Sequence, residues 1–355
     1  HVEPGDDPQA GPELAGAEDY HKFAATDSAS AATAWATGYK TDDGNIAWLP
    51  GDPEGGALKT IAEWLREKRG FAIGVVSTVP FTHATPAAHV SHNKSRNKYH
   101  EIGDEILTMV KPEVVIGAGY PAGSSYISTD TYNEVLNDGD YLVVTRAAGV
   151  DGGIAVLNAA QQAAESGRKL FGLFGGSGGH FESLQANDFP GTPLVKQATV
   201  ENPTLAEASL AALKVLSQDP DGFFVAIEQG DIDWANHGND FQRMVGTTKD
   251  LNDAVQTIID FVNQPDDEIE WDNTLLIVTS DHSNSYMRNQ EVLGAGDLPQ
   301  QSKTSPPSYP DGEVTYGSTS HTNELVRLYA MGTGIQKFSR YEGKWYRGTR
   351  ILDNT

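Results

Sequence analysis

The sequence contains no cysteine, which excludes disulfide bonds and thiolate ligands to a metal ion. Any metal that this chain binds must therefore be held by carboxylate, imidazole and hydroxyl groups. Long hydrophobic runs are also absent. No apolar stretch approaches the roughly 20 residues that a membrane-spanning helix needs, so the sequence predicts no membrane span.

Positive charge is scarce as well. The chain has 25 Lys and Arg residues against 49 Asp and Glu residues, which gives a formal net charge of −24. A nucleic-acid-binding surface is not expected, because binding of a phosphate backbone depends on clustered basic side chains. Such acidity keeps a protein soluble and suits a salty environment. If the chain binds an anion, the site needs a local source of positive charge, and metal ions are one such source.

Short apolar segments rich in β-forming residues alternate with segments of helical periodicity. The expected strands are residues 71–78, 113–116, 141–145, 169–174, 223–228, 273–281 and 325–331. The expected helices are residues 28–37, 57–68, 99–110, 153–165, 205–217 and 241–262. Runs that are apolar on both faces, such as 275–278, are typical of parallel strands covered by helices.

This alternation predicts a single α/β domain over residues 1–355. The expected architecture is a three-layer α/β/α sandwich with a mostly parallel central sheet. Residues 286–320 are rich in Gly, Pro and Ser, and we expect them to form a long loop insertion within that domain.

Ser28 is the first candidate functional residue. It lies in a run of small residues, 26–34, that is followed by Gly38, a plausible helix C-cap. Ser28 is expected in the first turn of this helix, where free N–H groups and the helix dipole favour an anion. Taken alone, a serine at such a place is more often an N-cap than a nucleophile.

Carboxylates and imidazoles occur together in three later segments of the chain. Asp233 and His237 are four residues apart, so one helical turn places both on the same face. Asp281 and His282 follow an apolar strand, and His321 comes later. Each group alone has an ordinary explanation as a turn or as a surface pair. Together they favour a ligand site, because open α/β sheets bind ligands at the carboxyl ends of their strands.

These segments, in this order, resemble the alkaline phosphatase family from about Tyr20 to the end of the chain. The matching blocks are Asp27-Ser28-Ala29, then His83-Ala84-Thr85-Pro86-Ala87-Ala88 with Arg96, then Glu228 with Asp233 and His237, then Asp281-His282, and finally His321. The agreement of five blocks in sequence order makes the resemblance specific.

The resemblance implies two zinc ions and one magnesium ion. The implied ligands are Asp233, His237 and His321 for one zinc, Asp281, His282 and Ser28 for the second, and Thr85 and Glu228 for the magnesium. Arg96 would bind two phosphate oxygens, as the planar guanidinium group favours. The implied reaction is hydrolysis of small-molecule phosphate monoesters, with inorganic phosphate as product, through a phosphoserine at Ser28. A homodimer and a periplasmic or secreted location are further implications.

Two alternatives remain open. The first is a phosphodiesterase-type or phosphonate-type hydrolase of the same fold, although such relatives usually have a threonine nucleophile and lack an arginine placed like Arg96. The second is an inactive remnant that binds metal or phosphate. Both can be distinguished by the metal content and by the relative rates on a monoester and a diester.

The sequence departs from the family at two kinds of position. His83 stands where some members have Asp, and Trp234 stands where some have Lys. This pair resembles some marine and halophilic members, and we expect both side chains near the substrate. Trp234 cannot offer phosphate a charged donor, and His83 could bind a metal ion or a water molecule in the third metal site. We expect magnesium there first, with zinc or cobalt as alternatives.

The second departure concerns the two ends of the chain. The family has an early strand ending in Asp-Gly-Met-Gly, whose Asp bridges the second zinc and the magnesium, and no such motif lies between His1 and Asp27. We therefore expect a longer native protein, with family segments beyond both ends. The other histidines, including His89, His92 and His100, are expected to be packing or surface residues, and His180 has no expected role.

Overall fold

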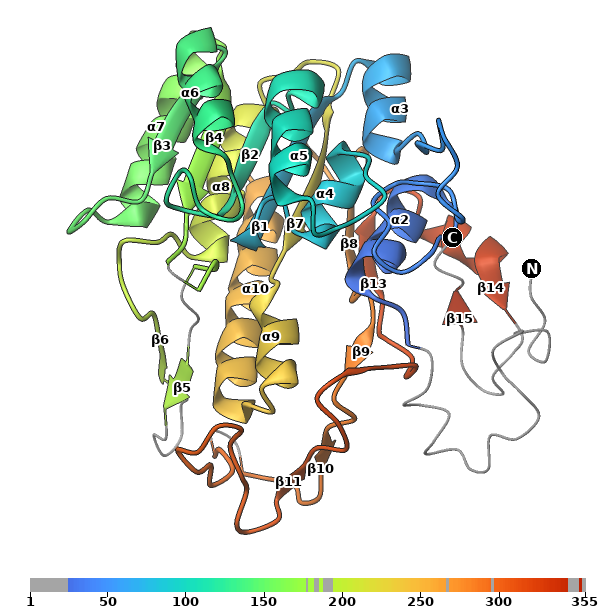
Figure 1. Cartoon of the computed structure of the whole chain (residues 1–355), viewed down its shortest axis with the longest axis vertical. Coiled ribbons are helices and arrows are strands. Elements are labelled where there is room, and N and C mark those ends of the chain that lie inside the picture. The colour runs from blue at the N-terminus through green and yellow to red at the C-terminus, as the bar shows by residue number, and fades with distance from the viewer. Residues whose placement is uncertain are drawn as a thin grey trace.

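The computed structural model describes residues 25–176, 178–181, 185–187, 194–265, 268–294, 297–343 and 351–352. Its centre is a five-stranded sheet of order β3-β4-β2-β1-β7, in which all neighbours are parallel (Figure 1). The strands are β1 Ala72–Pro80, β2 Val114–Ala118, β3 Tyr141–Thr145, β4 Lys169–Phe174 and β7 Phe223–Glu228. The predicted α/β fold with a mostly parallel sheet is confirmed.

Helices cover both faces of this sheet. One face packs against α2 Ser28–Thr37, α3 Ile61–Arg69, α4 Ala84–Val90, α5 Tyr99–Asp104, the π-helix η1 Glu105–Val110 and α6 Thr129–Asp138. The other face packs against α7 Gly152–Ser166, α8 Leu205–Leu216 and α10 Phe241–Val262. Successive residues of a strand point to opposite faces, so Val75 belongs to the first core and Val76 to the second. This arrangement gives the three predicted layers.

Some expected helix boundaries were wrong for identifiable reasons. The expected helix 57–68 begins only at Ile61, because Thr60 and Glu63 form a reciprocal capping box. The expected helix 99–110 is an α-helix that continues as a π-helix from Glu105. The short helix α9, Asp231–His237, was foreseen only as a turn that presents two ligands on one face.

The last apolar strand differs more from the prediction. β8, Leu275–Val278, lies outside the five-stranded sheet and pairs antiparallel with β13, Tyr329–Gly332. Its side chains Leu275 and Ile277 are 44% and 45% exposed. The run 275–278 was therefore wrongly taken as a strand buried on both faces, since an apolar pattern does not fix the strand's partner or direction.

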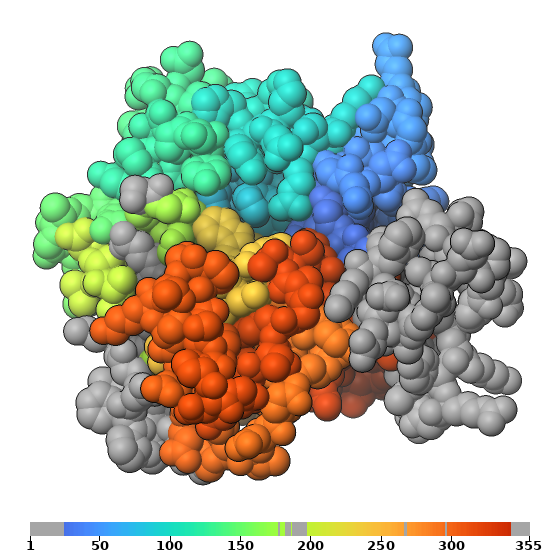
Figure 2. Space-filling view, turned by 60° about the horizontal axis from the view of Figure 1, so that its bottom comes forward, coloured from blue at the N-terminus to red at the C-terminus, as the bar shows by residue number. Residues whose placement is uncertain are grey.

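The segment 286–320 is connected to the rest of the domain at a small two-stranded sheet. β9, Ser283–Asn284, pairs antiparallel with β12, His321–Thr322, and the segment runs between them. It contains the short pair β10 Arg288–Asn289 and β11 Val314–Thr315. Figure 2 shows the orange and red part of the chain, to which this segment belongs, as a broad surface below the blue and teal part.

This segment also contacts the junction of α9 and α10. The Tyr309 hydroxyl donates to the carbonyl of Asn239 at 2.5 Å and accepts from the Phe241 amide at 2.9 Å. The remaining short strands are β5 Gln185–Asn187, β6 Leu194–Lys196, β14 Glu342–Gly343 and β15 Ile351–Leu352. Among the described residues, none of the helices combines the length and apolar character that crossing a membrane requires.

Candidate active site

Ser28 is the first residue of α2, and it is not the residue that caps this helix. The N-cap is Asp27, whose Oδ1 accepts from the Ser30 amide at 2.9 Å. The ordinary explanation of Ser28 as an N-cap is therefore wrong. Its Oγ lies 3.1 Å from Nε2 of His282 instead. Gly38 ends the helix with φ 78°, as the sequence predicted.

The second carboxylate oxygen of Asp27 binds Arg96. Nη1 of Arg96 donates to Asp27 Oδ2 at 3.0 Å, and the Gly44 amide donates to the same oxygen at 3.1 Å. Burial alone would raise the pKa of Asp27, but the hydrogen bonds from Ser30 and the charge of Arg96 hold it below its usual value. An ionised Asp27 therefore holds the guanidinium group beside the residue that follows it, Ser28.

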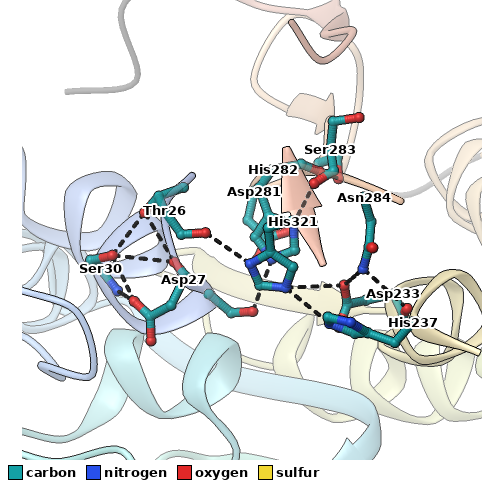
Figure 3. Close-up of polar contacts among 12 residues, drawn as sticks. Thr26, Asp27, Ser30, Asp233, His237, Asp281, His282, Ser283, Asn284 and His321 are labelled. Atoms are coloured by element: carbon teal, nitrogen blue, oxygen red, sulfur yellow. Dashed lines mark hydrogen bonds and ion pairs between the residues drawn. The ribbon is translucent and has the colours of Figure 1, made fainter. Parts of the chain in front are cut away.

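Three histidines, His237, His282 and His321, converge on one point (Figure 3). Nε2 of His237 and Nε2 of His321 are 3.1 Å apart, and the rings of His282 and His321 stack with centroids 3.5 Å apart. Two carboxylates join them. Asp233 lies 3.3 Å from Nε2 of His237 and 3.4 Å from Nε2 of His321, and Asp281 lies 3.0 Å from Nε2 of His282.

The opposite ring nitrogens face backbone carbonyl groups. Nδ1 donates to the Thr319 carbonyl at 2.6 Å in His237, to the Thr26 carbonyl at 2.8 Å in His321, and to the Ser283 carbonyl at 3.3 Å in His282. A carbonyl oxygen only accepts, so Nδ1 carries a proton in each ring and Nε2 is directed inward. This arrangement of donated Nδ1–H groups is typical of histidines that bind a metal through Nε2.

The donor set fits a metal ion. Nε2 of His237 and Nε2 of His321 face each other at 3.1 Å, a separation at which the two nitrogens can share a proton or a metal ion. Asp233, His282 and His321 offer ligand atoms that all lie within 4.8 Å of one another. Nitrogen and oxygen donors of this kind suit zinc. The two predicted zinc sets lie together in one cluster.

Asp233 is held at the centre of this cluster by Asn284. Nδ2 of Asn284 donates to Asp233 Oδ1 at 2.5 Å. Burial alone would raise the pKa of Asp233, but His237 and His321 lower it far below its usual value. The hydrogen bond to Asp233 in turn raises the pKa of His237. The cluster therefore keeps Asp233 ionised and attracts positive charge.

Glu228 lies at the end of β7 and faces β1. Ser77, its partner in the parallel register, donates to Glu228 Oε2 at 2.5 Å. Burial raises the pKa of Glu228 to about 7, the charges of Asp281 and Asp233 act in the same direction, and hydrogen bonds from Ser77 and Thr85 oppose the rise. The Thr85 hydroxyl and the Glu228 carboxylate lie together near the carboxylates of Asp281 and Asp233. Such a set of oxygen atoms suits a hard cation such as magnesium.

His83 and Trp234 lie beside each other. Their ring centroids are 5.7 Å apart at an interplanar angle of 76°. The ring of Tyr99 also stacks on His83, with the two centroids 5.9 Å apart. Burial and the charge of Arg96 lower the pKa of His83 to about 4, so this imidazole is neutral near pH 7. It can therefore offer a lone pair to a cation or to a water molecule.

Contacts thus run from Arg96 through Asp27 and Ser28 to the histidines, while Thr85 with Glu228 and His83 with Trp234 form two further groups. Sequence reasoning missed several partners: Asp27 as the helix cap, Asn284, the carbonyl groups of Thr26 and Thr319, and His180, which contacts Trp234. The polar run 282–285 next to a predicted ligand was the only signal for Asn284. Nothing in the sequence connected His180 to this place.

Residues 12–305 match the family described as Alkaline phosphatase. Alkaline phosphatase 3 of Bacillus subtilis (strain 168) is 31% identical over 278 residues, which cover 73% of this chain and 49% of that protein. The alkaline phosphatase of Escherichia coli (strain K12) is 29% identical, with 86% and 69% covered. Streptomycin-6-phosphate phosphatase of Streptomyces griseus is 28% identical, with 73% and 62% covered. The chain spans about half the length of the Bacillus subtilis relative.

Solved structures show the same fold. The cold-active alkaline phosphatase from a psychrophilic Shewanella species superposes with a TM-score of 0.66 at 22% identity, over 88% of this chain and 81% of that one. The alkaline phosphatase from the Antarctic bacterium TAB5 superposes with a TM-score of 0.60 at 23% identity, over 87% and 77%.

Proposed function

Because the chain belongs to the alkaline phosphatase family, we propose that it hydrolyses phosphate monoesters through a phosphoserine at Ser28. The observation that carries this proposal is the position of Ser28 Oγ, 3.1 Å from His282 Nε2 at the edge of the histidine and carboxylate cluster. A hydroxyl at this place can be activated by the same cations that the cluster binds. The substrates proposed are small-molecule phosphomonoesters.

The proposed cofactors are two zinc ions and one magnesium ion. The residues that would hold them are Asp233, His237 and His321 for one zinc, Asp281, His282 and Ser28 for the other, and Thr85 and Glu228 for magnesium. When bound, these ions supply positive charge that favours the Ser28 alkoxide and offsets the charge of the phosphate and of the departing oxygen. They would also let a chain of net charge −24 bind an anion.

The side chains of the protein perform the remaining tasks. Ser28 Oγ attacks phosphorus, the new O–P bond forms as the ester O–P bond breaks, and the alcohol departs. Water then cleaves the phosphoserine and regenerates Ser28. Arg96 donates to the non-bridging oxygens throughout, and Asp27 keeps its guanidinium group oriented. We propose that Trp234 and His83 form the neighbouring wall of the phosphate site.

The test compares hydrolysis of p-nitrophenyl phosphate with that of bis(p-nitrophenyl) phosphate by the zinc-loaded and magnesium-loaded protein. We expect faster hydrolysis of the monoester, and Ser28→Ala should lower its rate by roughly 10³-fold or more. Acid quenching after incubation with radiolabelled phosphate should leave label on Ser28 and none on the Ser28→Ala variant.

The other two functions predict different outcomes. Faster hydrolysis of the diester would favour a phosphodiesterase. Full metal occupancy without turnover of either ester would favour a binding protein. A homodimer and a periplasmic or secreted location are further proposals, and light scattering of the purified protein checks the first of them.

A further inference from the structure

Trp234 contacts a second histidine that belongs to none of the proposed metal sites. The rings of His180 and Trp234 have centroids 5.4 Å apart at an interplanar angle of 75°, which is an edge-to-face contact. The contact between His83 and Trp234 has nearly the same geometry, 5.7 Å and 76°. Trp234 is therefore in contact with one histidine from the β1–α4 loop and another from the loop after β4.

Both histidines are themselves supported. Tyr99 stacks on His83 at an interplanar angle of 14°, and Tyr126 lies 5.2 Å from Tyr99. On the other side, Nδ1 of His180 lies 3.2 Å from Asp231 Oδ1. Tyr126, Tyr99, His83, Trp234 and His180 form a continuous row of rings, which we call the aromatic row.

Asp231 ties the end of this row to α9. Its side chain is 1% exposed, and Nη2 of Arg243 donates to Asp231 Oδ1 at 2.7 Å. A buried carboxylate is tolerated only where charged or polar partners compensate for lost hydration, and here Arg243 and His180 do so. Asp231 is the first residue of α9, the same short helix that carries Asp233, Trp234 and His237.

Backbone hydrogen bonds fix the loop that carries His180. The His180 carbonyl accepts from the Gly176 amide at 3.0 Å, and the next residue, Phe181, donates its amide to the Thr78 carbonyl of β1 at 2.8 Å. A Cβ at Gly179 would lie 2.7 Å from the Tyr126 ring, so this ring packs directly on the loop backbone. The position of the His180 ring is therefore set by β1, by Tyr126 and by Asp231.

We propose that His180 is a positioning residue, which orients Trp234 and the start of α9 and thereby sets the affinity of the site for the phosphate group. This inference rests on the proposed placement of Trp234 at the phosphate site. Loss of the His180 ring frees one side of the indole, whereas loss of its nitrogen frees the ring from Asp231. Either change weakens phosphate binding while the metal ligands remain.

Two variants separate these contacts. His180→Asn keeps a polar group for Asp231 and removes the ring, whereas His180→Phe keeps a ring and removes the nitrogen. The zinc-loaded and magnesium-loaded proteins are titrated with inorganic phosphate by calorimetry, with metal content and melting temperature measured in parallel. We expect His180→Asn to weaken phosphate binding roughly tenfold and His180→Phe to weaken it less, at unchanged metal content. His100→Asn, at an exposed histidine outside the aromatic row, is the matched control.

A double-mutant cycle with Trp234→Ala decides whether the effect passes through Trp234. The proposal predicts that His180→Asn has no further effect on phosphate affinity in the Trp234→Ala background. Equal losses in both backgrounds, or a lowered melting temperature with unchanged phosphate affinity, would overturn it. Because calorimetry needs no turnover, a His180-dependent affinity in an inactive protein would support this inference while the proposed phosphatase activity failed.

Discussion

Two parts of the molecule supply residues to the candidate site, and they are built differently. β1 and β2 are buried along their whole length. The pair β8–β13 forms its own two-stranded sheet and leaves every second side chain exposed. We call the five-stranded sheet with its covering helices the first part, and Thr85 follows its strand β1. The second part is the pair β8–β13 with residues 279–284 and 319–324, which include Asp281, His282 and His321.

The difference lies in what fixes each group in space. The first part is fixed by two packed cores, so the β1–β7 register alone brings Ser77 to Glu228. In the second part, His321 donates through Nδ1 to the Thr26 carbonyl, just before α2, and Asn284 donates to Asp233 of α9. We infer that the second part depends on the site for its order, and that the first part does not.

The largest expected effect compares two isoleucines. Ile116 in β2 is 0% exposed and Ile277 in β8 is 45% exposed. Ile116→Ala should lower the free energy of unfolding by about 2–5 kcal/mol, because it opens a cavity in the core. Ile277→Ala should cost less than about 1 kcal/mol. Denaturant titration of both variants measures this, and equal costs would mean that β8 is as buried in solution as β2.

Metal removal should affect the two parts unequally. A bound ion present at a hundred times its dissociation constant stabilises the folded state by about 2.7 kcal/mol. A chelator should therefore lower the melting temperature and speed amide hydrogen exchange in residues 275–284 and 319–324, with little change in β1 and β2. Uniform acceleration across the chain would contradict the proposed division.

Asn284 tests how strongly the second part depends on one hydrogen bond. Asn284→Ala removes the donor to Asp233 Oδ1, and loss of such a partner to a ligand typically weakens metal affinity by about 10–100-fold. Zinc competition with a chromophoric chelator measures the change. Asn289→Ala, at an exposed asparagine of β10, is the matched control. Equal zinc affinities in the two variants would mean that Asn284 does not support the metal ligand Asp233.

The smallest expected effect is confined to the first part. Burial alone would lower the pKa of His92, but its contacts with Glu105 at 2.9 Å and Glu63 at 3.3 Å raise it to about 10. A raised pKa contributes stability that is complete below the ordinary value of about 6.5 and is lost as pH rises toward 10.

His92→Gln should therefore cost about 1.5 kcal/mol at pH 6, as expected for a hydrogen bond to a charged group, and much less at pH 10. Denaturant titrations at both pH values measure this. The proposed hydrolysis of p-nitrophenyl phosphate at fixed temperature should stay unchanged, since His92 lies outside the site. A cost that is independent of pH would contradict the ion-pair interpretation.

Much of the first part could be predicted from the sequence. The expected strands 141–145, 169–174 and 223–228 coincide with β3, β4 and β7, and the expected helices 28–37 and 241–262 coincide with α2 and α10. Capping residues and glycines mark the ends of these helices, and buried parallel strands are apolar along their length. Local patterns are enough where an element packs in the central sheet or against it, as these five do.

The second part could not be predicted in the same way. The pairing of β8 with β13 joins segments about 50 residues apart, and the apolar run 275–278 carries no information about its partner. Asn284 and His180 are likewise defined by what they meet in space. The resemblance named the candidate ligands, but the carbonyl groups that orient the three imidazoles are invisible in any side-chain pattern.

The irregular pairing of β1 with β2 has a consequence for how this chain can change in length. Val76 pairs with Ile116 and Pro80 with Ala118, so β1 advances four residues where β2 advances two. The extra length includes Val79, whose side chain meets the backbone of Gly230 just before α9. Removing one residue here would retract the following loop by about 3.3 Å and carry Thr85 away from Glu228. We therefore expect a deletion in residues 77–79 to disrupt the site.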